Sequence, residues 1–194
     1  MGFTRTELES FRGATLPDLL GPATRLLFVG INPGLLTAAV QAHFGRRGNR
    51  FYPALFRAGI VDHLIDASAG FADEDRALLL DRGIGITNLV AGATARASEL
   101  TPAELVAGAG NLERLAARVK PAVVAILGIT AYRVAFSRPQ AGVGRQRQGI
   151  SGAQLWVVPN PSGLNAHASL ADLAVAYREV ALAAGVLRPR QSLE

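Results

Sequence analysis

The strongest constraint on the fold is a set of four short apolar runs without alternation of polar and apolar residues. Continuous apolar character is typical of strands that are buried on both faces of a parallel sheet. The runs are rich in aliphatic residues and are RLLFVGI (25–31), IGITNLV (84–90), AVVAILG (122–128) and LWVVPN (155–160). Each is therefore predicted to be a strand of one central sheet.

Helical segments are predicted between and after these runs. Residues 101–104, Thr-Pro-Ala-Glu, form a capping box with proline at the first helical position, and residues 169–172 form a second, weaker box. Helices are expected over 101–118, 170–184, 73–81 and 129–137. Strands that alternate with helices imply right-handed crossovers. The predicted fold is an α/β, three-layer α/β/α sandwich with a short, mostly parallel central sheet.

Length and composition indicate one compact domain. The chain has 194 residues, of which 49% are hydrophobic, so we expect a single domain over 1–194, with an N-terminal extension (1–15) and a flexible tail (188–194). The segment 137–152 is expected to be an exposed basic loop or hairpin. No apolar run approaches the roughly 20 residues that cross a bilayer, and the N-terminus lacks the apolar core of a secretory signal. We therefore expect a cytoplasmic protein, associated with the nucleoid if the source is bacterial, and no membrane partner.

Several kinds of site lack their markers. The absence of cysteine excludes disulfides, thiolate nucleophiles and iron–sulfur clusters. Three histidines without a ligand spacing predict no metal site. The GxSxG, GxxxxGK[ST] and GxGxxG motifs are missing as well, so no cofactor is expected.

The net charge points to a phosphate-rich partner. It is +5, and arginine supplies almost all of the excess, with Lys120 the only lysine. Such a surface suits nucleic acid, because neutralising phosphates releases counterions. The arginine bias is also explained by coding composition alone, so charge by itself leaves both explanations open.

The ends of the predicted strands are where a ligand is expected, because open α/β sheets bind ligands at the carboxyl edge. Asn32-Pro33-Gly34, Asn88 and Asn160 lie there. Pro33 favours extended geometry at Asn32, and an amide can hold a water although it has almost no basicity. A reaction assisted by such a group needs a leaving group that departs largely unaided, as uracil does from an N-glycosidic bond. The alternative is that Asn32 only forms an Asx-turn.

Three motifs in order give a more specific indication. GINPG (30–34), HFGRRGNRFYPALFRAGI (43–60) and VVPNPSGLNAH (157–167) together resemble the mismatch-specific uracil/thymine-DNA glycosylase family of the uracil-DNA glycosylase superfamily. The similarity extends from about Leu19 to Leu187. It implies an α/β/α fold and flipping of a base into a pocket at the carboxyl edge of the sheet.

The resemblance assigns candidate roles within that pocket. Asn32 corresponds to the residue that positions the attacking water, and Phe44 to the residue that stacks on the flipped base. Asn160 corresponds to an amide that contacts the base, and backbone groups near Ile31 to those that read the pyrimidine edge. Asn88 lies at a position that varies in the superfamily, where it can assist the water or contact the base. Phe44 also fits an ordinary core position.

The resemblance also implies contacts with the DNA duplex. The loop after Asn160 corresponds to a wedge that enters the duplex and faces the widowed base, namely Gly163, Leu164 and Asn165. Three arginines are candidate phosphate contacts: Arg46, Arg47 and Arg50. Leu164 also fits a core position, and the arginines also fit a solvated surface.

Two departures from the family pattern leave parts of the site open. Asn165-Ala166-His167 stands where many relatives place an arginine after the wedge, so the hold on the opposite strand is uncertain. Gly92-Ala93-Thr94 stands where Arg-Pro-Thr is common, so the breadth of the pocket is uncertain.

The sequence thus predicts a monomeric, monofunctional DNA glycosylase. Its expected partner is double-stranded DNA with mispaired or damaged pyrimidines, from which it would excise uracil, with thymine or modified pyrimidines as further candidates. The alternative is a damage- or mismatch-binding module with little catalysis. A hydrolase that acts on free nucleosides or nucleotides is the third interpretation.

Overall fold

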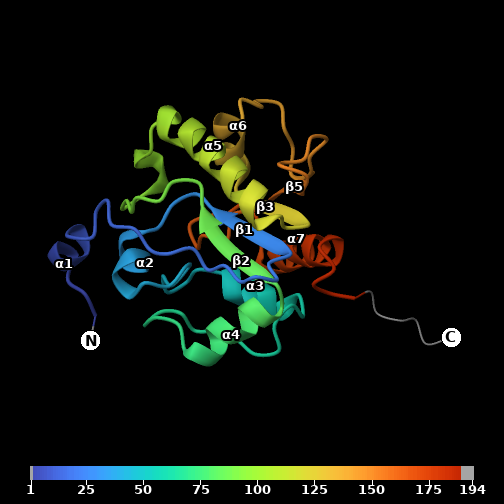
Figure 1. Ribbon diagram of the computed structural model, residues 1–194. Coiled ribbons are helices and arrows are strands. Elements are labelled where there is room, and N and C mark those ends of the chain that lie inside the picture. The colour runs from blue at the N-terminus through green and yellow to red at the C-terminus, as the bar shows by residue number, and fades with distance from the viewer. Residues whose placement is uncertain (1, 189–194) are drawn as a thin grey trace.

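The fold is an α/β sandwich around a five-stranded sheet. The computed structural model describes residues 2–188. The sheet has the order β2-β1-β3-β5-β4, in which the first four strands are parallel and the short β4 pairs antiparallel with β5. Helices cover both faces of this sheet (Figure 1). The α/β class and the mostly parallel sheet predicted from the sequence are confirmed.

The four apolar runs are the four parallel strands. They are β1 (Leu26–Gly30), β2 (Ile84–Asn88), β3 (Val123–Leu127) and β5 (Gln154–Val158). Every residue of β1 and β3 is buried, as expected of strands covered on both faces. The predicted helices form as α4 (Asp73–Asp81), α5 (Pro102–Val119), α6 (Ile129–Ala135) and α7 (Leu170–Ala183). Both predicted capping boxes, at Thr101 and Ser169, are present.

The connections place a topological switch beside β1. The chain leaves β1, passes through α3 (Phe51–Arg57) and α4 to β2 on one side, and then returns through α5 to β3 on the other side of β1. In Figure 1, α5 and α6 lie on one face of the sheet, whereas α3, α4 and α7 lie on the opposite face. Crossovers that leave on opposite faces open a crevice at the carboxyl ends of the two central strands.

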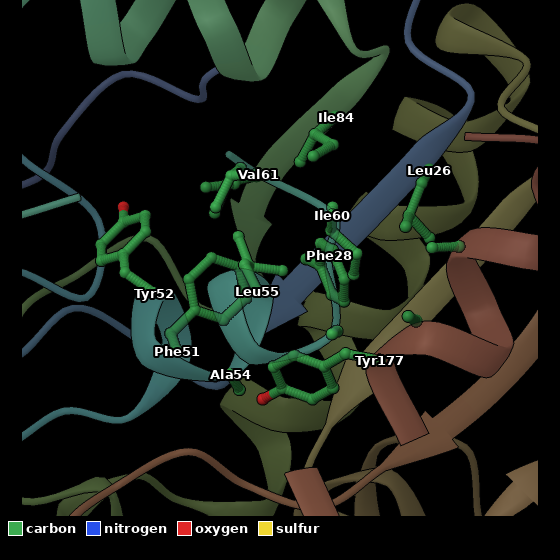
Figure 2. Packing of buried hydrophobic residues seen from close by; sticks show 14 of the residues in the cluster. Leu26, Phe28, Phe51, Tyr52, Ala54, Leu55, Ile60, Val61, Ile84 and Tyr177 are labelled. Carbon is green, nitrogen blue, oxygen red and sulfur yellow. The ribbon is translucent and has the colours of Figure 1, made fainter. Parts of the chain in front are cut away.

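Aromatic residues dominate the core under α3 and α7. Phe28 of β1 packs edge-on against Phe51 at 5.2 Å between ring centroids, and Tyr177 of α7 lies 5.3 Å from Phe28. Figure 2 shows these rings together with Tyr52 and Leu55. Burial raises the pKa of the Tyr177 hydroxyl well above its usual value. This cluster fixes α3 against the sheet and thereby the loop that precedes it.

A second apolar cluster lies under α5 and α6. It depends on the close packing of α5 against the backbone that follows β2. Leu27 and Val29 of β1 point to this face and pack with Leu112 of α5. A Cβ on Gly108 would lie 2.4 Å from the carbonyl oxygen of Leu89, so only glycine lets α5 pack here. This contact positions the chain that follows β2.

Three short helices were not anticipated, and the basic segment 137–152 contains one short strand. The unanticipated helices are α1 (Arg5–Glu9), α2 (Leu35–Val40) and α3. The N-cap residues of α2 and α3 are Gly34 and Arg50, and neither makes a side-chain cap hydrogen bond. Within 137–152, only β4 (Gly144–Arg145) is a strand, paired with Val157 and Trp156. The segment expected to be an exposed loop or hairpin is thus mostly loop, and its one strand pairs with β5 beyond it.

The N-terminal segment packs against the sheet edge. Gly13 donates to the carbonyl of Ala93, and Ala93 donates to that of Ala14, at 2.8 and 2.9 Å. Arg12 pairs with Glu99 in the 3₁₀ helix η1 (Ala97–Glu99). The segment expected to be an extension thus touches the loop after β2.

None of the helices in residues 2–188 is long and apolar enough to cross a membrane. The predicted flexible tail lies almost entirely outside the described residues.

Candidate functional site

A cavity of about 360 Å³ opens at the carboxyl edge of the sheet. Its volume is at the lower end of the range of about 300–1,000 Å³ that small ligands occupy. It gathers residues from segments far apart in the sequence, and it includes seven of the predicted site residues: Ile31, Asn32, Phe44, Arg46, Asn88, Asn160 and Leu164. The predicted strand ends therefore converge on one site.

Asn32 is held by its amino group. Its Nδ2 donates to Thr94 Oγ1 at 2.7 Å and also lies within hydrogen-bonding distance of the carbonyl oxygens of Pro33 and Gly92. Thr94 in turn donates to the carbonyl of Arg96 at 2.8 Å, and its N–H bonds to Pro33. No group of residues 2–188 donates to Asn32 Oδ1. The carboxamide oxygen is thus left as the acceptor, whereas the Asx-turn weighed for this residue is not formed.

Asn160 is held by its side-chain oxygen, whereas Asn32 is held by its amino group. Its Oδ1 accepts from the N–H of Ser162 at 2.8 Å, which makes an Asx-turn at the start of the loop after β5. Its Nδ2 lies 3.6 Å from the position of a Cβ on Gly128 and has no hydrogen-bond acceptor among the described residues. Asn160 therefore offers a donor at the cavity, where Asn32 offers an acceptor.

Asn88 lies across from Gly30, with which it pairs in register. A Cβ on Gly30 would be only 2.4 Å from Asn88 Oδ1 and 3.5 Å from Phe44 Cε1. Only glycine therefore permits this arrangement of the two side chains. Asn88 Nδ2 lies 3.4 Å from Nδ1 of His43.

Phe44 belongs to both the core and the cavity. Its ring stacks on the buried Phe51, with centroids 4.1 Å apart and planes inclined by 27°, while it also lines the cavity. Its φ of +56° is unusual for a phenylalanine. The hydroxyl of Tyr52 donates to the carbonyl of the preceding residue at 2.7 Å and so supports this turn. The two alternatives weighed for Phe44, core and pocket, are thus combined in one ring.

The loop over 160–168 displays Leu164, a residue that is 77% exposed. Arg50 lies beneath the loop, where its Nη atoms donate to the carbonyl oxygens of Ser162, Asn165 and Ala168 at 2.6–2.8 Å. The side chain of Asn165 donates to the carbonyl of Asn160 at 2.9 Å. A Cβ on Gly163 would lie 2.7 Å from the carbonyl oxygen of Gly48. The loop is therefore fixed on its inner side, and its leucine faces solvent.

The arginines predicted to contact phosphates occupy three different environments. Arg46 is exposed and lines the cavity. Arg47 is exposed and lies near Asp66, whose pKa is lowered mainly by hydrogen bonds from Ser68 and to a smaller degree by the charge of Arg47. Arg50 is turned inward. The sequence analysis missed Arg96, which is exposed and also lines the cavity, and Thr94, which holds Asn32.

The cavity is neutral apart from the two arginines at its rim. No aspartate or glutamate of the described chain lines it, and burial lowers the pKa of His43, the one histidine there. Within residues 2–188, no group of three acidic or histidine side chains is arranged to hold a metal ion. Amide and hydroxyl groups are thus the neutral polar chemistry that the cavity offers.

A second cavity of about 680 Å³ lies at the hairpin edge. Apart from Tyr132, its lining comes from residues 137–148, among them Arg138, Arg145 and Arg147. None of the residues assigned a role from the sequence lies in it.

Comparisons with known proteins identify a family and support the fold. Residues 17–182 match the family described as the uracil DNA glycosylase superfamily. A solution NMR structure of a candidate uracil DNA glycosylase from Methanosarcina acetivorans is similar to 87% of this chain and 98% of its own, with a TM-score of 0.57 and 17% identity. At 17% identity, the similarity to this solved structure supports the α/β fold of the chain.

Proposed function

Because the chain belongs to the uracil DNA glycosylase superfamily, and so to enzymes that hydrolyse N-glycosidic bonds in DNA, we propose that it excises uracil from mispairs in duplex DNA. Thymine and modified pyrimidines are further candidate substrates. The enzyme would be monofunctional and would start base excision repair. This finer assignment corresponds to the mismatch-specific uracil/thymine-DNA glycosylases that the sequence resembles.

The observation that carries the proposal is the anchoring of Asn32. Three acceptors surround its two N–H groups within hydrogen-bonding distance, so the amide cannot turn over without losing these contacts. Its oxygen is then left to accept a hydrogen bond from a water in the cavity. A water held in this way is oriented without being deprotonated, because an amide is not a base.

Hydrolysis at such a site follows a dissociative course. The bond between C1′ and the base nitrogen N1 breaks first, and its electron pair leaves with the base. The water held by Asn32 then adds to the oxocarbenium-like sugar at C1′ and loses its proton to solvent. The products are the free base and an abasic site.

Neighbouring residues would hold the flipped nucleotide. The outer face of Phe44 would stack on the base, since Phe51 supports the inner face. Asn160 Nδ2 would donate to a carbonyl oxygen of the pyrimidine. The side chain of Leu164 would fill the gap in the duplex, because it is exposed on a fixed loop.

The arginines would have two different roles, phosphate binding and support of the loop over 160–168. Arg46 and Arg96 at the rim would bind phosphates, whereas Arg50 would hold the wedge loop instead of contacting DNA. The contributions of Arg47, Gly163 and Asn165 to DNA binding stay predictions. The proposal includes a monomer that acts in the cytoplasm, without a cofactor.

The test is excision from a duplex with one G·U mispair, followed by alkali, which cleaves the abasic strand. The protein should nick the uracil strand, and Asn32→Ala should lower the single-turnover rate by about 10²-fold, because the water loses its positioning group. Equal product from both proteins would overturn the catalytic role.

A binding module is the second candidate, because no carboxylate of residues 2–188 lines the cavity. Under that alternative the protein would bind the G·U duplex, but product would not form even with enzyme in excess. The same assay therefore separates the two.

A further inference from the structure

His43 is buried beside the cavity, and the proposed chemistry does not use it. Its side chain is enclosed, with the whole residue 3% exposed. Its two ring nitrogens lie at hydrogen-bonding distance from groups of different chain segments, 26 residues before it and 45 after it. A buried ring with both nitrogens engaged has a fixed orientation.

The partners of His43 determine its tautomer. Nε2 lies 3.0 Å from the carbonyl oxygen of Pro17. A carbonyl only accepts, so Nε2 carries the hydrogen. In the neutral ring, Nδ1 then has the lone pair and accepts from Asn88 Nδ2 at 3.4 Å.

Neutrality of His43 follows from its surroundings. Burial is the largest influence and lowers its pKa, and the charge of Arg76 acts in the same direction. The hydrogen bond to Pro17 and the charge of Asp18 act in the opposite direction and are smaller. Protonation would place an N–H at Nδ1, facing the amino group of Asn88.

We propose that His43 is a positioning residue that fixes the amide of Asn88, so that Asn88 presents its oxygen to the cavity. With Nδ2 bound to His43, Oδ1 is directed over Gly30, where a Cβ would be 2.4 Å away. The flipped amide would place a donor at that point and would leave His43 Nδ1 facing a carbonyl oxygen. The flipped amide therefore loses the hydrogen bond between Asn88 and His43.

The proposal rests on the proposed function only for its kinetic readout. His43→Leu removes both contacts and should lower the single-turnover rate on G·U duplex by about five- to tenfold, the equivalent of one hydrogen bond. His43→Gln can again donate with its nitrogen and accept with its oxygen, and should recover most of that loss. Duplex affinity should change less than twofold in both variants.

A double-mutant cycle separates positioning from a structural effect. If His43 acts through Asn88, adding His43→Leu to Asn88→Ala should cost no more than about twofold beyond Asn88→Ala alone. Full additivity of the two losses would overturn the proposal. Melting temperatures of all variants, measured in parallel, should not track the rates.

A second readout needs no activity. In protein labelled with ¹⁵N-histidine, the His43 ring should show the Nε2–H tautomer, and Asn88→Ala should shift its Nδ1 resonance. An Nδ1–H tautomer, or a resonance that Asn88→Ala leaves unchanged, would overturn the proposal. If the protein cleaves no base but the resonance behaves as expected, the proposed function fails and the positioning stands.

Discussion

The two cavities differ in how they are built. The cavity at the carboxyl edge is the smaller, at about 360 Å³ against about 680 Å³, but it joins segments from β1, β2, η1 and the loop after β5. The cavity at the hairpin edge is lined almost wholly by one stretch of chain. In the smaller cavity, hydrogen bonds between distant segments fix the amides of Asn32 and Asn88. In the larger cavity, the amide of Gln146 bonds only to carbonyls of its own stretch of chain, and the arginines are exposed. Size is therefore a poorer guide to chemistry here than the fixing of polar groups.

The largest difference in excision rate is expected between two variants that each add one methyl group, one in each cavity. Gly30→Ala displaces the amide of Asn88, because its Cβ would lie 2.4 Å from Asn88 Oδ1. A displacement of that kind should lower the single-turnover rate of uracil excision by about 10²-fold.

Gly142→Ala in the hairpin cavity is the matched control, because its Cβ would meet nothing within 4 Å. Its excision rate should equal that of the parent protein. Equal losses in the two variants would remove the distinction between the cavities.

Thr94 tests whether the fixing of amides matters. Thr94→Val keeps the shape and removes the acceptor for Asn32 Nδ2, so the excision rate should fall by about tenfold. Thr94→Ser retains the hydroxyl and should stay within about twofold of the parent. If serine and valine at this position behave alike in the kinetic assay, the hydrogen bond to Asn32 is not what holds the water.

Leu164 and Val143 are exposed aliphatic residues near the two cavities, at 77% and 64%. Leu164→Ala should weaken binding to a G·U duplex by about fivefold, since an apolar wedge loses contact area. Val143→Ala should leave affinity unchanged, and neither should alter the melting temperature. Fluorescence anisotropy with labelled duplex measures both, and a larger loss for Val143→Ala would move the DNA surface to the hairpin.

The smallest effect concerns the arginines at each cavity. Replacing Arg46 and Arg96 with glutamine should reduce the slope of log affinity against log salt by about 2, one unit for each phosphate contact. Replacing Arg145 and Arg147 should leave the slope nearly unchanged. A titration of duplex binding between low and moderate salt gives both slopes, and a reversed order would assign the phosphate contacts to the hairpin.

Much of the fold was predictable because its signals are local. The four apolar runs became the parallel strands, and the capping boxes at Thr101 and Ser169 mark where two helices begin. The short helices α1, α2 and α3 have only five to seven residues, too few to show a periodic pattern.

The site was predictable at its strand ends but not in its internal contacts. Asn32, Asn88 and Asn160 follow from the rule that ligands bind at the carboxyl edge. The contacts that fix Asn32 and Asn88 join residues up to 62 positions apart, and such pairings leave no mark in a single sequence. The inward turn of Arg50 was missed for the same reason.

The N-terminal segment has a consequence for how this enzyme can be altered. Gly13 and Ala14 bracket Ala93, next to Thr94, and Pro17 holds His43. The segment before residue 17 lies outside the matched family region, yet it supports the loops that carry the amides. Exchanging this segment between related chains is therefore a way to tune turnover without changing any group that contacts the substrate. Trimming it beyond residue 12 would remove the hydrogen bonds that support the loop of Ala93 and Thr94.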